Sequence, residues 1–194
     1  LIVPIGRWVL GEACRTARQW PRHEGLGAKV RVNLSARQFE QASLVNDVVA
    51  ALNESGLQPG RLCLELTESA LVPDIDIAAQ TLTRLREIGV SVALDDFGTG
   101  YSSLSYLKRL PIDVLELDQS FVGGLPDDPY DLAIVQAVSG LARKTGLEIV
   151  AEGVETESQA QALRDAGVEG AQGYLFSPPV DAETLLQAWA TAGD

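Results

Sequence analysis

Residues 89–100 read GVSVALDDFGTG, and this stretch decides which fold the chain is expected to adopt. The apolar, β-branched run from Val90 to Leu94 is typical of a buried strand. Two carboxylates, Asp95 and Asp96, follow where this strand ends, and the glycines after them allow the backbone to turn or to approach a ligand closely. The stretch therefore predicts a buried strand that carries acidic side chains to one edge of a sheet.

The same order of segments recurs along the chain, because short β-branched runs alternate with amphipathic runs whose apolar residues are three and four positions apart. Strands are expected at residues 29–34, 61–66, 90–94, 112–117, 147–151 and 171–173. Helices are expected at residues 4–20, before Gly56, at 76–89, 102–109 and 130–144, before Gly167, and from 182 onward. The face of the first helix that we expect to be buried holds Ile5, Trp8, Val9, Ala13, Ala17 and Trp20.

Alternating strands and helices predict an α/β fold with a parallel sheet and right-handed crossovers. Such a sheet can stay open and doubly wound, or it can curl into a (β/α) TIM-like barrel. The barrel is favoured because polar residues recur at the C-terminal end of nearly every strand, whereas an open sheet usually gathers its site at one switch point. Since a complete barrel has eight strands, we expect a partial barrel whose first strands lie upstream of Leu1.

Length and charge limit the class of protein. The 194 residues suit one domain over residues 1–194, and the formal net charge of −12 argues against nucleic acid and anionic membranes as partners. No stretch has the length of a membrane span or the pattern of a signal peptide. The sequence therefore predicts a cytoplasmic domain without direct membrane contact, which could be the cytoplasmic part of a membrane-anchored protein.

The polar residues at the predicted strand ends supply oxygen ligands, without Cys or His. They are Asn33, Glu65, Asp95, Asp96, Glu116, Asp118, Glu152 and Gln172. Oxygen ligands suit a hard cation such as Mg²⁺ or Mn²⁺, and two ions about 4 Å apart are a recurring device for displacement at phosphorus. Any one of these carboxylates could simply be solvated, but several on one rim would repel one another unless cations or protons intervened. The set points to phosphodiester hydrolysis with one or two divalent ions.

Five motifs resemble those of the EAL domain family, cyclic di-GMP phosphodiesterases with a modified TIM barrel. They are VNLS at 32–35, ELTES at 65–69, DDFGTGYSSL at 95–104, AEGVE at 151–155 and QGYLF at 172–176. The family order and spacing are kept, and the resemblance covers essentially the whole chain. The resemblance implies that residues 1–194 are roughly the C-terminal three quarters of an EAL domain.

The resemblance also implies roles for individual residues. The implied metal ligands are Asn33, Glu65, Asp95, Asp96 and Glu152, around one or two Mg²⁺ or Mn²⁺ ions. The implied substrate-binding residues are Gln172, Asp96, Ser35, Arg37, Tyr174 and Pro179, and the implied catalytic positions are Glu152, Asp118 and Glu116. Glu68, Thr99 and Gly100 would anchor the loop that couples substrate binding, metal binding and dimer contacts.

The sequence departs from the family pattern at several positions. The signature Glu-Ala-Leu strand is absent, Pro178 stands where many members have a basic residue, and Glu116 stands where active members carry a lysine. Strand alternation turns Leu115 and Leu117 toward the helices, so Glu116 is expected inside the barrel, where it needs a partner. Losing one well-placed charge-stabilising donor can cost about 10²- to 10³-fold in rate.

The expected function is therefore binding of cyclic di-GMP with weak or no hydrolysis, in a phosphodiesterase family whose activity is impaired here. The alternatives are an active metal-dependent phosphodiesterase that yields linear pGpG, a protein-interaction scaffold that binds no nucleotide, and an unrelated barrel acting on a sugar phosphate. By the same resemblance, we expect a homodimer fused to an upstream GGDEF or sensory domain.

Overall fold

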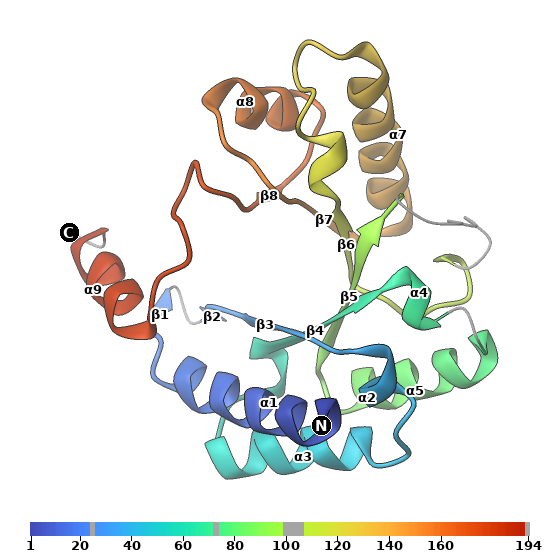
Figure 1. Cartoon of the computed structure of the whole chain (residues 1–194), viewed down its shortest axis with the longest axis vertical. Coiled ribbons are helices and arrows are strands. Elements are labelled where there is room, and N and C mark those ends of the chain that lie inside the picture. The colour runs from blue at the N-terminus through green and yellow to red at the C-terminus, as the bar shows by residue number, and fades with distance from the viewer. Residues whose placement is uncertain (24–25, 72–73, 99–106, 193–194) are drawn as a thin grey trace.

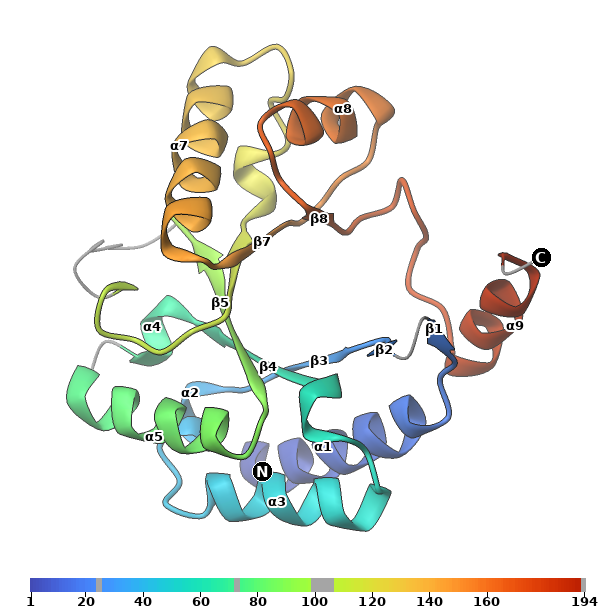
Figure 2. The same cartoon turned by 180° about the vertical axis from the view of Figure 1, so that it is seen from behind.

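The computed structural model describes residues 1–23, 26–71, 74–98 and 107–192. Its centre is a six-stranded sheet in which all paired neighbours run parallel. The strands are β3 (Val30–Asn33), β4 (Leu62–Thr67), β5 (Ser91–Phe97), β6 (Val114–Leu117), β7 (Glu148–Ala151) and β8 (Gly170–Ala171). They lie side by side in sequence order, and the sheet curls as a half-barrel (Figures 1 and 2). This order confirms the partial barrel, because a doubly wound sheet would reverse direction at a switch point.

The helices surround the curled sheet, mostly on its outside, and the last helix lies apart from the sheet (Figures 1 and 2). They are α1 (Ile2–Arg18), α2 (Ala36–Phe39), α3 (Leu44–Ser55), α4 (Glu68–Leu71), α5 (Ile75–Glu87), α7 (Pro129–Thr145), α8 (Glu157–Asp165) and α9 (Ala182–Ala192). Two 3₁₀ turns, η1 (Pro59–Arg61) and η2 (Gln119–Phe121), and a short antiparallel pair, β1 (Arg22–His23) and β2 (Leu26–Gly27), complete the described elements. Most of the helix expected at 102–109 lies outside the described residues. None of the helices in the described ranges is long and apolar enough to cross a bilayer.

The first helix buries only part of the face that was expected. Leu10, Cys14 and Ala17 are its buried residues, and Ala13 and Trp20 pack against the core. Ile5, Trp8 and Val9 are 52%, 65% and 39% exposed, so the expectation was wrong for these three residues.

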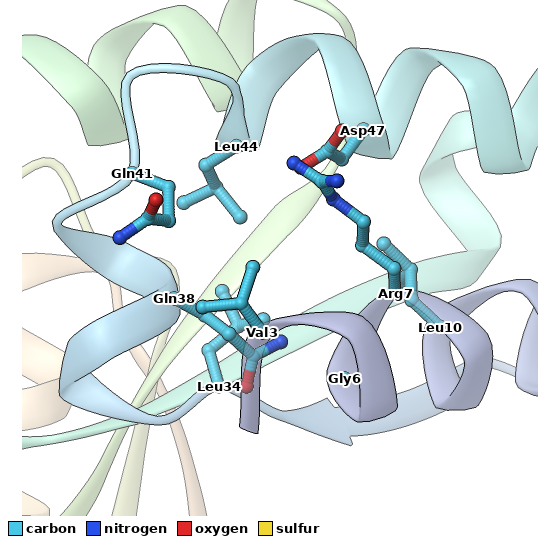
Figure 3. Close-up of a pocket in the computed structure, with 9 residues that line it drawn as sticks. All are labelled: Val3, Gly6, Arg7, Leu10, Leu34, Gln38, Gln41, Leu44 and Asp47. Atoms are coloured by element: carbon cyan, nitrogen blue, oxygen red, sulfur yellow. The ribbon is translucent and has the colours of Figure 1, made fainter. Parts of the chain in front are cut away.

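Side chains of α1, α2 and α3 line the small pocket drawn in Figure 3. The Arg7 guanidinium of α1 donates to Asp47 of α3 and to Ser43, the N-cap residue of α3, over 2.8 Å each. The pocket drawn there has a volume of about 10 Å³, close to the space needed by one water molecule. It is therefore too small for a nucleotide.

The two faces of the sheet carry different side chains. Leucines of β4, β5 and β6, including Leu115 and Leu117, belong to the main core that the helices cover. The opposite face holds a separate small buried cluster of Cys63, Ala93, Val114 and Val150. Since side chains alternate along a strand, Glu116 lies on the same inner face as Val114, which confirms its expected direction.

Candidate metal centre

Three acidic side chains converge at the C-terminal ends of neighbouring strands. Asp95 of β5, Glu116 of β6 and Glu152, which follows β7, each offer one carboxylate oxygen, and these oxygens lie within 4.8 Å of one another. A divalent cation binds oxygen at about 2.0–2.6 Å, so ligands on opposite sides of one ion are about 4–5 Å apart. The oxygen-only donor set and its spacing therefore fit Mg²⁺, Mn²⁺ or Ca²⁺.

A β-bulge places Asp95 and Asp96 at this centre. Leu94 pairs with Leu115, but the next pair is Phe97 with Leu117, so two residues of β5 lie opposite Glu116 alone. Asp96 takes a φ of 56°, which is uncommon outside glycine, and its backbone N–H donates to the Asp95 carboxylate over 2.7 Å. Bulges redirect side chains next to functional sites, and this one includes Asp95, which belongs to the cluster of three carboxylates.

The Glu116 side chain is completely buried and forms an ion pair with Arg31 of β3, which lies three strands away in the order of the sheet. The Arg31 guanidinium of β3 donates to Glu116 Oε1, while Glu116 Oε2 has no hydrogen-bond partner within the described part of the chain. Arg31 also lies 3.8 Å from the Glu65 carboxylate and 3.5 Å from that of Glu148. One guanidinium thus serves three carboxylates on the inner face.

Burial raises the pKa values of the carboxyl groups around this centre. The pKa of Glu65 rises from its ordinary 4.5 to about 7, chiefly because the group is desolvated; Arg31 lowers it, whereas Asp95 and Glu152 raise it further. Desolvation is also the main cause that raises the pKa values of Asp95 and Glu152. The Gln172 amide donates to Glu152 Oε1 over 2.6 Å and opposes that rise. These raised pKa values show that the carboxylates of the centre are stabilised by bound protons or bound cations.

The stabilisation by Mn²⁺ is expected to depend on pH through Glu65. The folded chain keeps the Glu65 proton up to about pH 7, whereas the unfolded chain releases it near pH 4.5. The folded state then binds more protons between these values, so the metal-free stability falls as the pH rises through this window. A cation needs the ionised carboxylate, so the rise in Tm caused by Mn²⁺ should grow from about pH 5 to about pH 7.5. Thermal melts with and without Mn²⁺ measure the rise in Tm at each pH. Glu65→Gln should make this rise less dependent on pH. An equal rise in Tm at pH 5 and pH 7.5 would contradict a role for Glu65 as a metal ligand.

The other residues with implied roles occupy several positions around the same edge. Asn33 is exposed and lies opposite Glu65 in the β3–β4 register, and Ser35 caps α2, in which Arg37 is exposed. Asp118 caps η2 by accepting from the Ser120 N–H over 2.9 Å. Glu68 begins α4, whereas Thr99 and Gly100 lie outside the described residues.

An open pocket of about 540 Å³ is lined by Glu152, one of the three clustered carboxylates. Its lining includes Glu152, Gln172, Tyr174, Pro178 and Pro179. The structure thus brings three implied substrate-binding residues and one implied metal ligand to a single cavity. Ser35, Arg37 and Asp96 are not among its lining residues.

The backbone beside Gln172 leaves no room for a side chain at Gly173. A Cβ there would lie 2.2 Å from the Val154 carbonyl oxygen and 2.3 Å from its nitrogen. Gly173→Ala should therefore destabilise the fold by about 1–3 kcal/mol and move Gln172 away from Glu152. Gly140→Ala in α7 is the control, because a Cβ there meets nothing within 4 Å. Urea unfolding compares the two, and equal stabilities would show that the backbone at Gly173 yields without cost.

The sequence analysis did not identify Arg31, the arginine that pairs with the carboxylates of this centre. Two signals could have revealed it. Arg31 lies two residues before Asn33 and so shares its face of the strand, and Glu116 required a partner inside the barrel. A basic side chain within an apolar strand is a candidate for such a partner.

Comparison with known proteins places this chain in the EAL domain family, whose model matches residues 1–179. The bifunctional diguanylate cyclase/cyclic di-GMP phosphodiesterase MucR of Pseudomonas aeruginosa is 48% identical over 190 residues, which are 98% of this chain and 28% of that protein. The chain therefore spans little more than a quarter of the length of this relative.

Two solved structures extend the comparison. The PaMucR phosphodiesterase in its c-di-GMP complex is 48% identical, with a TM-score of 0.89 over 96% of this chain and 75% of that one. Klebsiella pneumoniae BlrP1, solved as a manganese and cyclic di-GMP complex, is 30% identical, with a TM-score of 0.82 over 91% of this chain and 45% of that one. The half-barrel described above is thus an EAL-type half-barrel.

Proposed function

We propose that this chain binds cyclic di-GMP through divalent cations and hydrolyses it slowly or not at all. The observation that carries the proposal is the convergence of Asp95, Glu116 and Glu152 at the rim of an EAL-type sheet. A chain with a net charge of −12 repels phosphates unless cations lie between the two. The complexes of the relatives with cyclic di-GMP, one of them with manganese, support this choice of ligand.

The roles follow the positions of the residues. The proposed ligands of Mg²⁺ or Mn²⁺ are Asn33, Glu65, Asp95, Asp96 and Glu152. Bound cations would supply positive charge to the phosphate oxygens and would activate water for attack. Gln172, Tyr174 and Pro179 would hold the dinucleotide in the adjoining pocket, with Ser35 and Arg37 across the rim.

We propose slow hydrolysis because Glu116 stands where the family pattern predicts a lysine. A buried carboxylate at this place adds negative charge beside the phosphate and removes a proton donor, so it disfavours the transition state. Arg31 does not restore the missing donor, since its guanidinium already serves Glu116, Glu65 and Glu148. Binding needs only the cations and the pocket, which Glu116 leaves in place.

We further propose that the whole EAL domain of the native protein extends beyond this chain, is cytoplasmic, forms a homodimer and is joined to a GGDEF or sensory domain. Two observations support the extension: six strands are described where a barrel has eight, and this chain covers 75% of the PaMucR chain. Assays of activity therefore use the whole domain.

The test is calorimetric titration of the domain with cyclic di-GMP, in Mn²⁺ or in excess chelator, with chromatography of the products. Binding is expected with Mn²⁺ and should be lost in chelator, with little linear dinucleotide formed. Asp95→Asn is the matched variant that should lose the cation-dependent binding. Binding that ignores the cation would refute the proposal, as would an absence of binding or rapid turnover by the parent.

A further inference from the structure

The unpaired oxygen of Glu116 is the feature from which the inference starts. The Glu116 side chain is 0% exposed, Arg31 donates to its Oε1, and its Oε2 has no hydrogen-bond partner in the described ranges. Leaving a buried charged acceptor unsatisfied costs free energy, so such an atom needs an explanation. A ligand that binds Glu116 Oε2 would explain why this oxygen has no partner within the chain.

The neighbours of Glu116 identify the chemistry of that ligand. Asp95 and Glu152 each have a carboxylate oxygen within 4.8 Å of a Glu116 oxygen. Three carboxylates at this spacing repel a fourth anion and attract a cation. Because every donor atom is a carboxylate oxygen, the cation is a hard divalent ion.

The Arg31 guanidinium does not occupy the space between the three carboxylates. Its guanidinium contacts Glu116 Oε1, lies 3.5 Å from Glu148, and approaches Glu65 at 3.8 Å. Neither Asp95 nor Glu152 is among its ion-pair partners in the described part of the molecule. The guanidinium therefore holds Glu116 through Oε1, and Oε2 is left without a hydrogen-bond partner in the described ranges.

We propose that Glu116 is an added carboxylate ligand of the divalent cation between β5, β6 and β7, and that Arg31 is the positioning residue that holds it there. This inference rests on the proposed function and deepens it, because it gives the altered position a role in cation binding. In this proposal, a more tightly bound divalent ion supplies the positive charge that the family lysine would otherwise provide.

The test is titration of the metal-free domain with Mn²⁺ alone, with the free ion followed by electron paramagnetic resonance. Glu116→Gln keeps the shape of the side chain and removes its charge, and it should weaken Mn²⁺ binding by about 10-fold or more. Glu148→Gln is the matched control, because it removes another carboxylate partner of Arg31 that is 42% exposed and lies outside the cluster. This control should change the affinity by less than about 3-fold.

Each outcome bears on one proposal. If Glu116→Gln binds Mn²⁺ as tightly as the parent, the added ligand is refuted, while the proposed function stands. If the parent itself binds no Mn²⁺, the proposed function fails as well. Should Glu116→Gln not fold, the Arg31→Gln/Glu116→Gln variant removes both members of the ion pair and keeps the test, since replacing both partners can be nearly neutral. Weakened Mn²⁺ binding by this folded variant supports the inference, and parental affinity refutes it.

Discussion

The Arg31→Ala/Glu116→Lys variant of the whole domain is expected to hydrolyse cyclic di-GMP about 10²- to 10³-fold faster than the parent. Under the proposed function, it places an ammonium donor beside the phosphate and removes a carboxylate that would oppose negative charge in the transition state. Both changes are needed, because a lysine at position 116 alone would meet the Arg31 guanidinium inside the barrel. Chromatography of the linear product under saturating Mn²⁺ measures the rate.

Two comparisons make this result interpretable. The single Glu116→Lys variant should be less stable and less active than the double variant, since it buries two like charges together. Adding Asp95→Asn to the double variant should abolish the gained activity, which ties the gain to the cation. If the double variant forms product no faster than the parent, Glu116 does not limit turnover.

Arg31→Ala alone is expected to lower the free energy of unfolding of the metal-free domain by about 3–5 kcal/mol. Removing the guanidinium leaves Glu116 fully buried without its cation and deprives Glu65 of its nearest positive charge. Urea unfolding in chelator measures the loss. The Arg31→Ala/Glu116→Gln variant should recover most of it, because no uncompensated charge then remains.

The same variant tests whether the ion pair is structural. A loss of stability below about 1 kcal/mol would place the pair among exposed ion pairs of little energetic value. That outcome would contradict the role given to Arg31.

Much of the fold could be predicted from periodicity. The strand predicted from Val90 to Leu94 is found as β5 at Ser91–Phe97, and strand alternation correctly predicted that Glu116 faces inward. The choice of a curled over an open sheet also followed from the polar strand ends. These features depend on local patterns, which the sequence carries directly.

The site was harder to foresee because it depends on register and distance. The bulge that sets Asp95 and Asp96 against Glu116 is a property of two paired strands, and one strand alone does not reveal it. The contact between Arg31 and Glu116 spans 85 positions of sequence. The predicted burial of Trp8 was wrong for a related reason. An amphipathic helix has a broad apolar face, and tertiary packing decides which part of that face is buried.

Anomalous diffraction from crystals of the whole domain grown with Mn²⁺ tests the central claim most directly. The account predicts a manganese peak between Asp95 and Glu152, with a Glu116 oxygen about 2.0–2.6 Å from the ion. Crystals soaked to saturation that show no peak among these three carboxylates would contradict it.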